Sequence, residues 1–122
     1  MILADTSIWV DHLRFGDKEM RARLNQGGIA IHPFIIAELA LGSLRERRVT
    51  LALLDVLPHV RVAQTSELRL AIEARQLYRR GIGLVDAHLI ASVFLTSPTL
   101  LWTRDKRLRS LAESLEIDAG LA

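Results

Sequence analysis

The sequence predicts an α/β domain in which helices cover both faces of a central, mostly parallel sheet. The first observation is a set of short runs that are apolar throughout instead of at every second position, which is typical of strands buried on both faces. The second is that segments with helical spacing separate these runs, so that strand and helix alternate. The third is length, because 122 residues leave no room for a second sizeable core. We therefore expect residues 1–122 to form a single three-layer α/β/α domain.

The N-terminal half is expected to contain two of the strands. MILAD at residues 1–5 and GGIAIHP at 27–33 are short apolar runs bounded by polar residues, Gly or Pro, a pattern that favours buried strands. Thr6 or Ser7 can cap a helix directly after the first run. A helix is also expected over 34–44, and the Arg-rich SLRERR at its end is expected to be a solvated join to another helix.

The C-terminal half repeats the alternation. HVRVA at 59–63 and TLLWT at 99–103 are the other two expected strands. Helices are expected over 66–81, 86–96 and 108–115. Apolar residues recur at helical spacing in the first and third of these segments, and the first two begin with a Ser and an Asp that can cap them.

The composition excludes several kinds of function. The chain has no Cys, which removes disulfides, thiolate catalysis and Cys zinc sites and is compatible with a reducing cytoplasm, where we expect the protein to act. The formal charge is only +2, so net charge says little about partners. The N-terminus lacks the basic start of a secretion signal. The apolar run 81–103 contains Asp86, His88 and Pro98, so we expect no membrane span.

Three carboxylates stand alone in apolar surroundings. Asp5 is the only charged side chain in residues 1–10, Glu38 the only one in 24–44, and Asp86 the only one in 81–103, taking His as neutral. None of the residues three or four positions from Glu38 can pair with it along a helix. Burying an ionised carboxylate without a partner destabilises a fold by on the order of several kcal/mol. If these acids are buried, each therefore needs a compensating partner.

A parallel sheet offers these acids a common meeting place. Acids at the carboxyl ends of strands and at the following helix starts converge on one crevice. Asp5 ends the first strand, Asp86 opens a helix and Asp105 follows the last strand, while Glu38 has to reach the crevice from its own helix. Four gathered negative charges repel one another unless a divalent cation neutralises them. Oxygen ligands without Cys or paired His favour Mg²⁺ or Mn²⁺, which suits phosphodiester hydrolysis.

Each acid also has a purely structural interpretation. Asp5 and Asp86 can be helix caps, and Asp105 can be an exposed acid in the first turn of a helix, where the helix dipole favours it. Glu38 has no capping role, so its structural alternative is a salt bridge to a distant Arg. His88 follows Asp86 by two positions, but a lone His in a helix is more often structural than a general base.

Four segments, in order, resemble those of a known family. MILADTSIWVDHL resembles the opening of PIN-domain proteins, FIIAELALG their second acidic segment, GLVDAHLIAS their third and LLWTRDKRL their fourth. Together they look like the VapC-type toxins of bacterial toxin-antitoxin pairs, and the resemblance spans nearly the whole chain. It implies a PIN-like three-layer α/β/α fold with a central, mostly parallel sheet.

The resemblance also implies roles for individual residues. It assigns catalysis and metal binding to four acids, the last of them the more variable: Asp5, Glu38, Asp86 and Asp105. Three side chains fall where the family places hydroxyls that hydrogen-bond within the acidic cluster: Thr6, Ser7 and Thr103. The fourth acid stands in a basic stretch, which leaves open whether it binds metal directly.

The activity and partners that the resemblance implies are those of a type II toxin-antitoxin system. The expected toxin is an endoribonuclease dependent on Mg²⁺ or Mn²⁺ that cuts structured RNA, commonly transfer or ribosomal RNA. A cognate VapB-type antitoxin would hold it silent by laying its tail across the active site. The family also implies a homodimer.

Basic residues next to the expected crevice are candidates for contact with RNA phosphates. They form two groups, before and after the apolar run: Arg79 and Arg80, and Arg104, Lys106 and Arg107. The structural alternative for both groups is a solvated helix face, with Arg79 and Arg80 favoured at a helix C-terminus by the dipole.

Other function classes remain open. A strand-end aspartate also serves phosphotransfer receivers and aspartate-nucleophile phosphatases, but the paired acids of the former and the second Asp of the latter are absent. The alternative from a different class is a non-catalytic PIN-like module that binds RNA or a partner. Retention of all four acids disfavours it.

Overall fold

The computed structural model describes residues 1–122, and its strands form one parallel sheet. The three strands are β1 (Ile2–Ala4), β2 (Ile29–Ala30) and β3 (Leu100–Trp102), in the order β2-β1-β3. In the register, Leu3 of the central strand lies opposite Ala30 on one side and Leu101 on the other. The expected α/β class with a mostly parallel sheet is therefore confirmed.

The fourth expected strand, residues 59–63, does not form. Only His59 joins the sheet, through a single parallel bridge to Ile31. The neighbouring strand, β2, already ends at Ala30, so the segment can form β-bridge hydrogen bonds at one position only. The apolar run was necessary for a strand but not sufficient, because a strand also needs a neighbour of comparable length.

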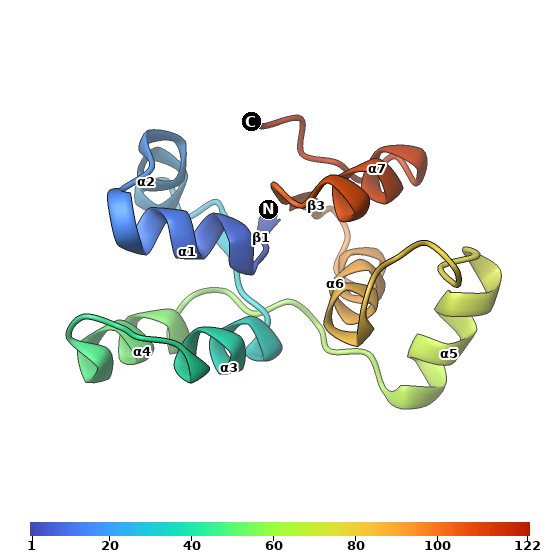
Figure 1. Cartoon of the computed structure of the whole chain (residues 1–122), viewed down its shortest axis with the longest axis horizontal. Coiled ribbons are helices and arrows are strands. Elements are labelled where there is room, and N and C mark those ends of the chain that lie inside the picture. The colour runs from blue at the N-terminus through green and yellow to red at the C-terminus, as the bar shows by residue number, and fades with distance from the viewer.

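Seven helices pack around the sheet in two layers (Figure 1). They are α1 (Thr6–Phe15), α2 (Lys18–Asn25), α3 (Pro33–Leu41), α4 (Arg47–Asp55), α5 (Thr65–Ala74), α6 (Leu84–Leu95) and α7 (Lys106–Ser114). In Figure 1, α1 to α4 lie on one side of the strands and α5 to α7 on the other. Strands that are apolar on both faces need such cover on both sides, so the three layers follow from the sequence pattern.

The starts of two helices differ from those expected. The cap of α1 is Asp5, and not Thr6 or Ser7. Helix α6 begins after Gly83, so that Asp86 lies in its first turn and is not its cap. The capping interpretation therefore holds for Asp5 and is wrong for Asp86.

Helix α5 ends earlier than its apolar spacing predicts. It stops at Ala74 instead of continuing to Gly81. Gln76 and Arg79 have φ angles of 53° and 60°, which a right-handed helix does not allow. The segment that leads to α6 is consequently a loop that carries two of the candidate RNA-binding arginines.

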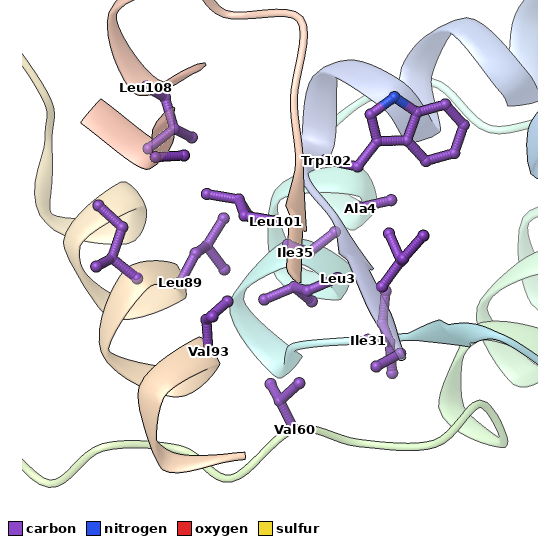
Figure 2. Close-up of a cluster of buried hydrophobic side chains, with 14 of the residues drawn as sticks. Leu3, Ala4, Ile31, Ile35, Val60, Leu89, Val93, Leu101, Trp102 and Leu108 are labelled. Carbon is purple, nitrogen blue, oxygen red and sulfur yellow. The ribbon is translucent and has the colours of Figure 1, made fainter. Parts of the chain in front are cut away.

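The buried side chains form one continuous core of 27 apolar residues. In Figure 2, Leu101 of β3 faces Leu89 and Val93 of α6, and Leu3 of β1 lies beside it. The middle of α6 is buried from Ala87 onward, which is typical of a helix that is apolar on all sides. This burial explains the apolar run that surrounds the first-turn acid of α6.

None of the seven helices has both the length and the hydrophobicity needed to cross a bilayer.

Candidate active site

The site begins where β1 and β3 end side by side. The backbone N–H of Asp5 donates to the carbonyl of Trp102 at 2.9 Å, which continues the pairing of the two strands by one residue. Asp5 follows β1 and Thr103 follows β3, so the parallel pairing places both at the same edge of the sheet. Asp5 is only 5% exposed and Thr103 only 1%. The strand order thus delivers a buried carboxylate and a buried hydroxyl to one point.

Both oxygens of the Asp5 carboxylate accept hydrogen bonds. Oδ1 accepts from the Ser7 hydroxyl at 2.5 Å and from the backbone N–H of Ile8 at 3.3 Å. Oδ2 accepts from the hydroxyl of Thr103. Burial raises the pKa of Asp5 above its ordinary value, and the bonds from Ser7 and Thr103 oppose that shift. The carboxylate is therefore fixed in one orientation while it caps α1.

Glu38 reaches the same region from α3 through a hydroxyl of α1. The Thr6 hydroxyl donates to Glu38 Oε1 at 2.6 Å. Glu38 is exposed, although its neighbours in sequence are apolar. No Lys or Arg lies within salt-bridge distance of it, so the alternative of a distant ion pair is wrong.

Asp86 shows most directly that the acids face one another. It lies half-buried in the first turn of α6. Its pKa is raised from 3.8 to about 6, first by burial and then by repulsion from Asp5, Asp105 and Glu38. Since that repulsion comes from residues in three other parts of the fold, the carboxylates of Asp5, Asp105 and Glu38 all lie near enough to act on Asp86. We call the region around Asp86 that these acids border the acidic space.

Asp105 has a structural task at the edge of this space. It is exposed and caps α7, where its Oδ1 accepts from the backbone N–H of Leu108 at 2.9 Å. Its own N–H donates to the Thr103 hydroxyl at 3.0 Å, which connects it to the hydroxyl that holds Asp5. Asp105 is exposed, as its structural interpretation expects, but it is the cap of α7 and not an acid of its first turn. Its repulsion of Asp86 adds a second role to capping.

The donor chemistry of this cluster fits a hard divalent cation. All four side chains offer oxygen, and none of them forms an ion pair with Lys or Arg. No group of three or more acidic or His side chains is close enough to hold one ion together. Mg²⁺ commonly takes only one or two protein carboxylates and completes its shell with water and phosphate oxygens, so the set suits it. A site in which all four acids bind metal stays a prediction.

The basic residues divide into two kinds. Four of them are exposed and free of ion pairs: Arg79, Arg80, Lys106 and Arg107. The Arg107 side chain lies against Gly81, so close that a Cβ there would be 2.9 Å from Arg107 Cδ. This contact joins the start of α7 to the loop before α6 and brings the two predicted basic groups together.

Arg104 differs from these residues because its guanidinium already forms ion pairs within the protein. It forms ion pairs with Asp11 Oδ2 at 2.8 Å and with Asp17 Oδ2 at 2.7 Å. The sequence prediction of an RNA contact at Arg104 did not anticipate these partners. No spacing along the chain links position 104 to positions 11 and 17, so sequence reasoning had no signal for the pairing.

His88 is part of the packing and not of the acidic space. It is buried, its ring lies edge-on to Phe34 at 4.8 Å between centroids, and burial lowers its pKa. The structural interpretation of this histidine is therefore confirmed.

Comparison with known proteins gives a consistent result. The family model described as PIN domain matches residues 2–114. Two relatives, both named Ribonuclease VapC32, come from Mycobacterium tuberculosis, one from strain CDC 1551 / Oshkosh and one from strain ATCC 25618 / H37Rv. Each is 44% identical to this chain over 110 residues, which cover 90% of this chain and 89% of the relative.

Proposed function

Because this chain belongs to the PIN-domain family and is similar along nearly its whole length to VapC-type ribonucleases, we propose that it is an endoribonuclease toxin. It hydrolyses phosphodiester bonds of structured RNA, with transfer or ribosomal RNA as the expected substrate. The reaction depends on Mg²⁺ or Mn²⁺. The resemblance read from the four acidic segments and the PIN-like α/β fold are both confirmed by the family match.

The observation that carries the proposal is that the carboxylates of Asp5, Asp105 and Glu38 repel that of Asp86, while none of the four forms an ion pair with Lys or Arg. A fold retains such an arrangement when an external cation compensates the charge. When bound, Mg²⁺ or Mn²⁺ supplies positive charge to a phosphate oxygen and lowers the pKa of a water molecule. Asp5 and Asp86 are the proposed principal ligands, with Glu38 and Asp105 at the rim.

The residues around the acids orient them for this task. Ser7 and Thr103 hold the two oxygens of Asp5, and Thr6 holds one oxygen of Glu38. Partners of this kind fix the direction in which a ligand presents its lone pairs. Because both Asp5 oxygens already accept bonds in a buried place, this carboxylate suits a fixed ligand better than a phosphate-accepting nucleophile.

The proposal extends to the protein's partners. A VapB-type antitoxin is the expected inhibitor, with its tail across the acidic space, and the toxin acts in the cytoplasm as a homodimer. A small gene directly upstream that encodes a DNA-binding protein with a short tail would support this part of the proposal.

The first expected outcome concerns metal removal. Purified protein should cleave a structured RNA in Mg²⁺ or Mn²⁺ and lose the activity in EDTA, because the carboxylates alone repel the phosphate. Cleavage is followed on a denaturing gel, and added Mn²⁺ should restore it. Cleavage that persists in EDTA would contradict the metal role, and RNA binding without cleavage in any metal would favour the non-catalytic module instead.

The second outcome concerns the exposed arginines of the loop before α6. The double variant Arg79→Gln, Arg80→Gln should raise KM and leave kcat nearly unchanged, because these side chains meet phosphates and not the reacting atoms. The slope of log affinity against log salt should fall by about 0.7 for each lost phosphate contact. Filter binding at several salt concentrations measures it.

The matched control is Arg45→Gln, Arg48→Gln. These two arginines are also exposed and unpaired, but they precede α4 or begin it, on the opposite side of the molecule in Figure 1. Equal losses in both double variants would show that the effect is one of net charge and not of a local RNA contact.

A further inference from the structure

Arg104 joins three elements of the fold at the edge of the acidic space. It lies in the connection between β3 and α7, and its side chain is 31% exposed. One guanidinium nitrogen contacts Asp11 of α1, and another contacts Asp17, the residue that caps α2. Two charge-assisted hydrogen bonds at 2.8 and 2.7 Å hold a planar fork far more firmly than one exposed pair would.

The backbone of the same residue belongs to the network that holds Asp5. The N–H of Arg104 donates to the Ser7 hydroxyl at 3.1 Å, and that hydroxyl donates to Asp5 Oδ1. The two neighbours of Arg104 in sequence also take part. The hydroxyl of Thr103 donates to Asp5 Oδ2, and the backbone N–H of Asp105 donates to that same hydroxyl. This short segment therefore supplies the hydroxyl that holds Asp5 Oδ2 and contacts the hydroxyl that holds Oδ1.

We propose that Arg104 is a positioning residue, whose bridge to Asp11 and Asp17 fixes residues 103–105 so that Ser7 and Thr103 hold Asp5 in its metal-binding orientation. The inference rests on the proposed function, because it is the metal that makes the orientation of Asp5 consequential. Arg104 contacts neither the metal nor the RNA. This role differs from the RNA contact that its place among basic residues predicts.

Electrostatics favour the bridge over an RNA contact. The backbone N–H of Met20 and, after it, the hydrogen bond that Arg104 donates lower the pKa of Asp17. The hydrogen bonds that Arg104 donates to Asp17 and Asp11 raise the pKa of Arg104, so the guanidinium and the carboxylates stabilise one another's charges. For the guanidinium to reach a phosphate, it would have to leave both carboxylates. The neighbours Lys106 and Arg107 have no such partners and are free to meet RNA.

The test compares Arg104→Gln and Arg104→Lys with the matched control Arg109→Gln. Arg109 is 37% exposed and its side chain also lies between two carboxylates, those of Glu113 and Asp118. Only its backbone N–H, which the substitution keeps, bonds to Asp105, and its side chain makes no ion pair with the residues that hold Asp5. Calorimetric titration gives the Mn²⁺ affinity of the metal-free protein, and steady-state cleavage gives kcat and KM. Thermal unfolding shows whether each variant is folded.

Arg104→Gln should weaken Mn²⁺ binding and lower kcat by about 10- to 100-fold, the usual effect of removing a partner that orients a ligand. KM for RNA and the salt slope should stay within about twofold of wild type, because no phosphate contact is lost. Arg104→Lys should have a Mn²⁺ affinity and a kcat between those of wild type and Arg104→Gln, since a single ammonium cannot pair with both carboxylates in the geometry of a guanidinium. Arg109→Gln should change neither Mn²⁺ affinity nor kcat.

Other results would overturn the inference. A raised KM and a smaller salt slope with unchanged kcat would make Arg104 an RNA contact, and equal losses in Arg109→Gln would make the effect one of general stability. A crystal structure of the Arg104→Gln protein decides independently of nuclease activity. If Asp5 kept its bonds from Ser7 and Thr103 in that structure, the inference would be wrong even if the proposed function were right. If those bonds were lost but the wild-type protein showed no metal-dependent cleavage, only the proposed function would be wrong.

Discussion

Replacing Asp5 with Asn is expected to lower kcat for RNA cleavage by more than about 100-fold. Removing a residue that merely orients a metal ligand costs about 10- to 100-fold, so removing a buried ligand costs more. The variant should still fold, because Asn is as good a helix cap as Asp and its oxygen can keep the bond from Ile8. Single-turnover cleavage, with the circular dichroism spectrum as a check on folding, measures the loss.

The control for this prediction is Asp118→Asn. Asp118 is also partly buried and accepts a backbone hydrogen bond, from Gly120, but it lies outside the acidic space. It should retain nearly full activity. An Asp5→Asn protein that kept more than about a tenth of wild-type kcat would show that Asp5 is not a principal ligand, given the loss expected for a ligand.

Replacing Asp86 with Asn is expected to abolish activity and, at the same time, to stabilise the metal-free protein near pH 7. The pKa of Asp86 is raised from 3.8 to about 6 in the fold, so the folded protein binds a proton more tightly than the unfolded chain does. Stability therefore falls as the pH rises from about 4 to 6, and the full cost is present at higher pH. The neutral amide removes that cost.

The expected gain is about 1 to 2 kcal/mol near pH 7, less than the whole pKa shift would give, because Asp86 is half-exposed and water screens its charge. Thermal unfolding in EDTA at several pH values measures it, and the gain should shrink as the pH falls toward 4. Added Mg²⁺ should stabilise wild type and leave Asp86→Asn unchanged. If the variant were less stable than wild type at every pH, burial and the neighbouring carboxylates would not destabilise the charged form of Asp86 as its raised pKa implies.

Part of the site could be predicted from the sequence because charge isolation is visible there. Asp5, Glu38 and Asp86 are conspicuous as single charges in apolar runs, and the structure brings them to one space with Asp105. The exposure of Glu38 could not be predicted, because its neighbours in sequence are apolar. In the fold, its side chain is at the surface, where it accepts a hydrogen bond from the Thr6 hydroxyl.

The capping and metal interpretations of the acids also proved compatible with each other. The sequence set them against one another, but Asp5 caps α1 and still faces the other acids, and Asp105 does the same at α7. A helix cap needs only one carboxylate lone pair, which leaves others for a cation. Only the position of the helix start relative to the strand end reveals this double use.

By itself, the sequence determined the α/β class, the parallel sheet, the approximate helices and the identity of the acids, because apolar periodicity and isolated charges are properties of neighbouring residues. The tertiary structure decided that the segment 59–63 remains outside the sheet and that α5 stops at Ala74. It also decided that Arg104 turns to Asp11 and Asp17. These outcomes depend on which distant segments come to lie beside each other, and contacts between residues some ninety positions apart leave no mark in local spacing.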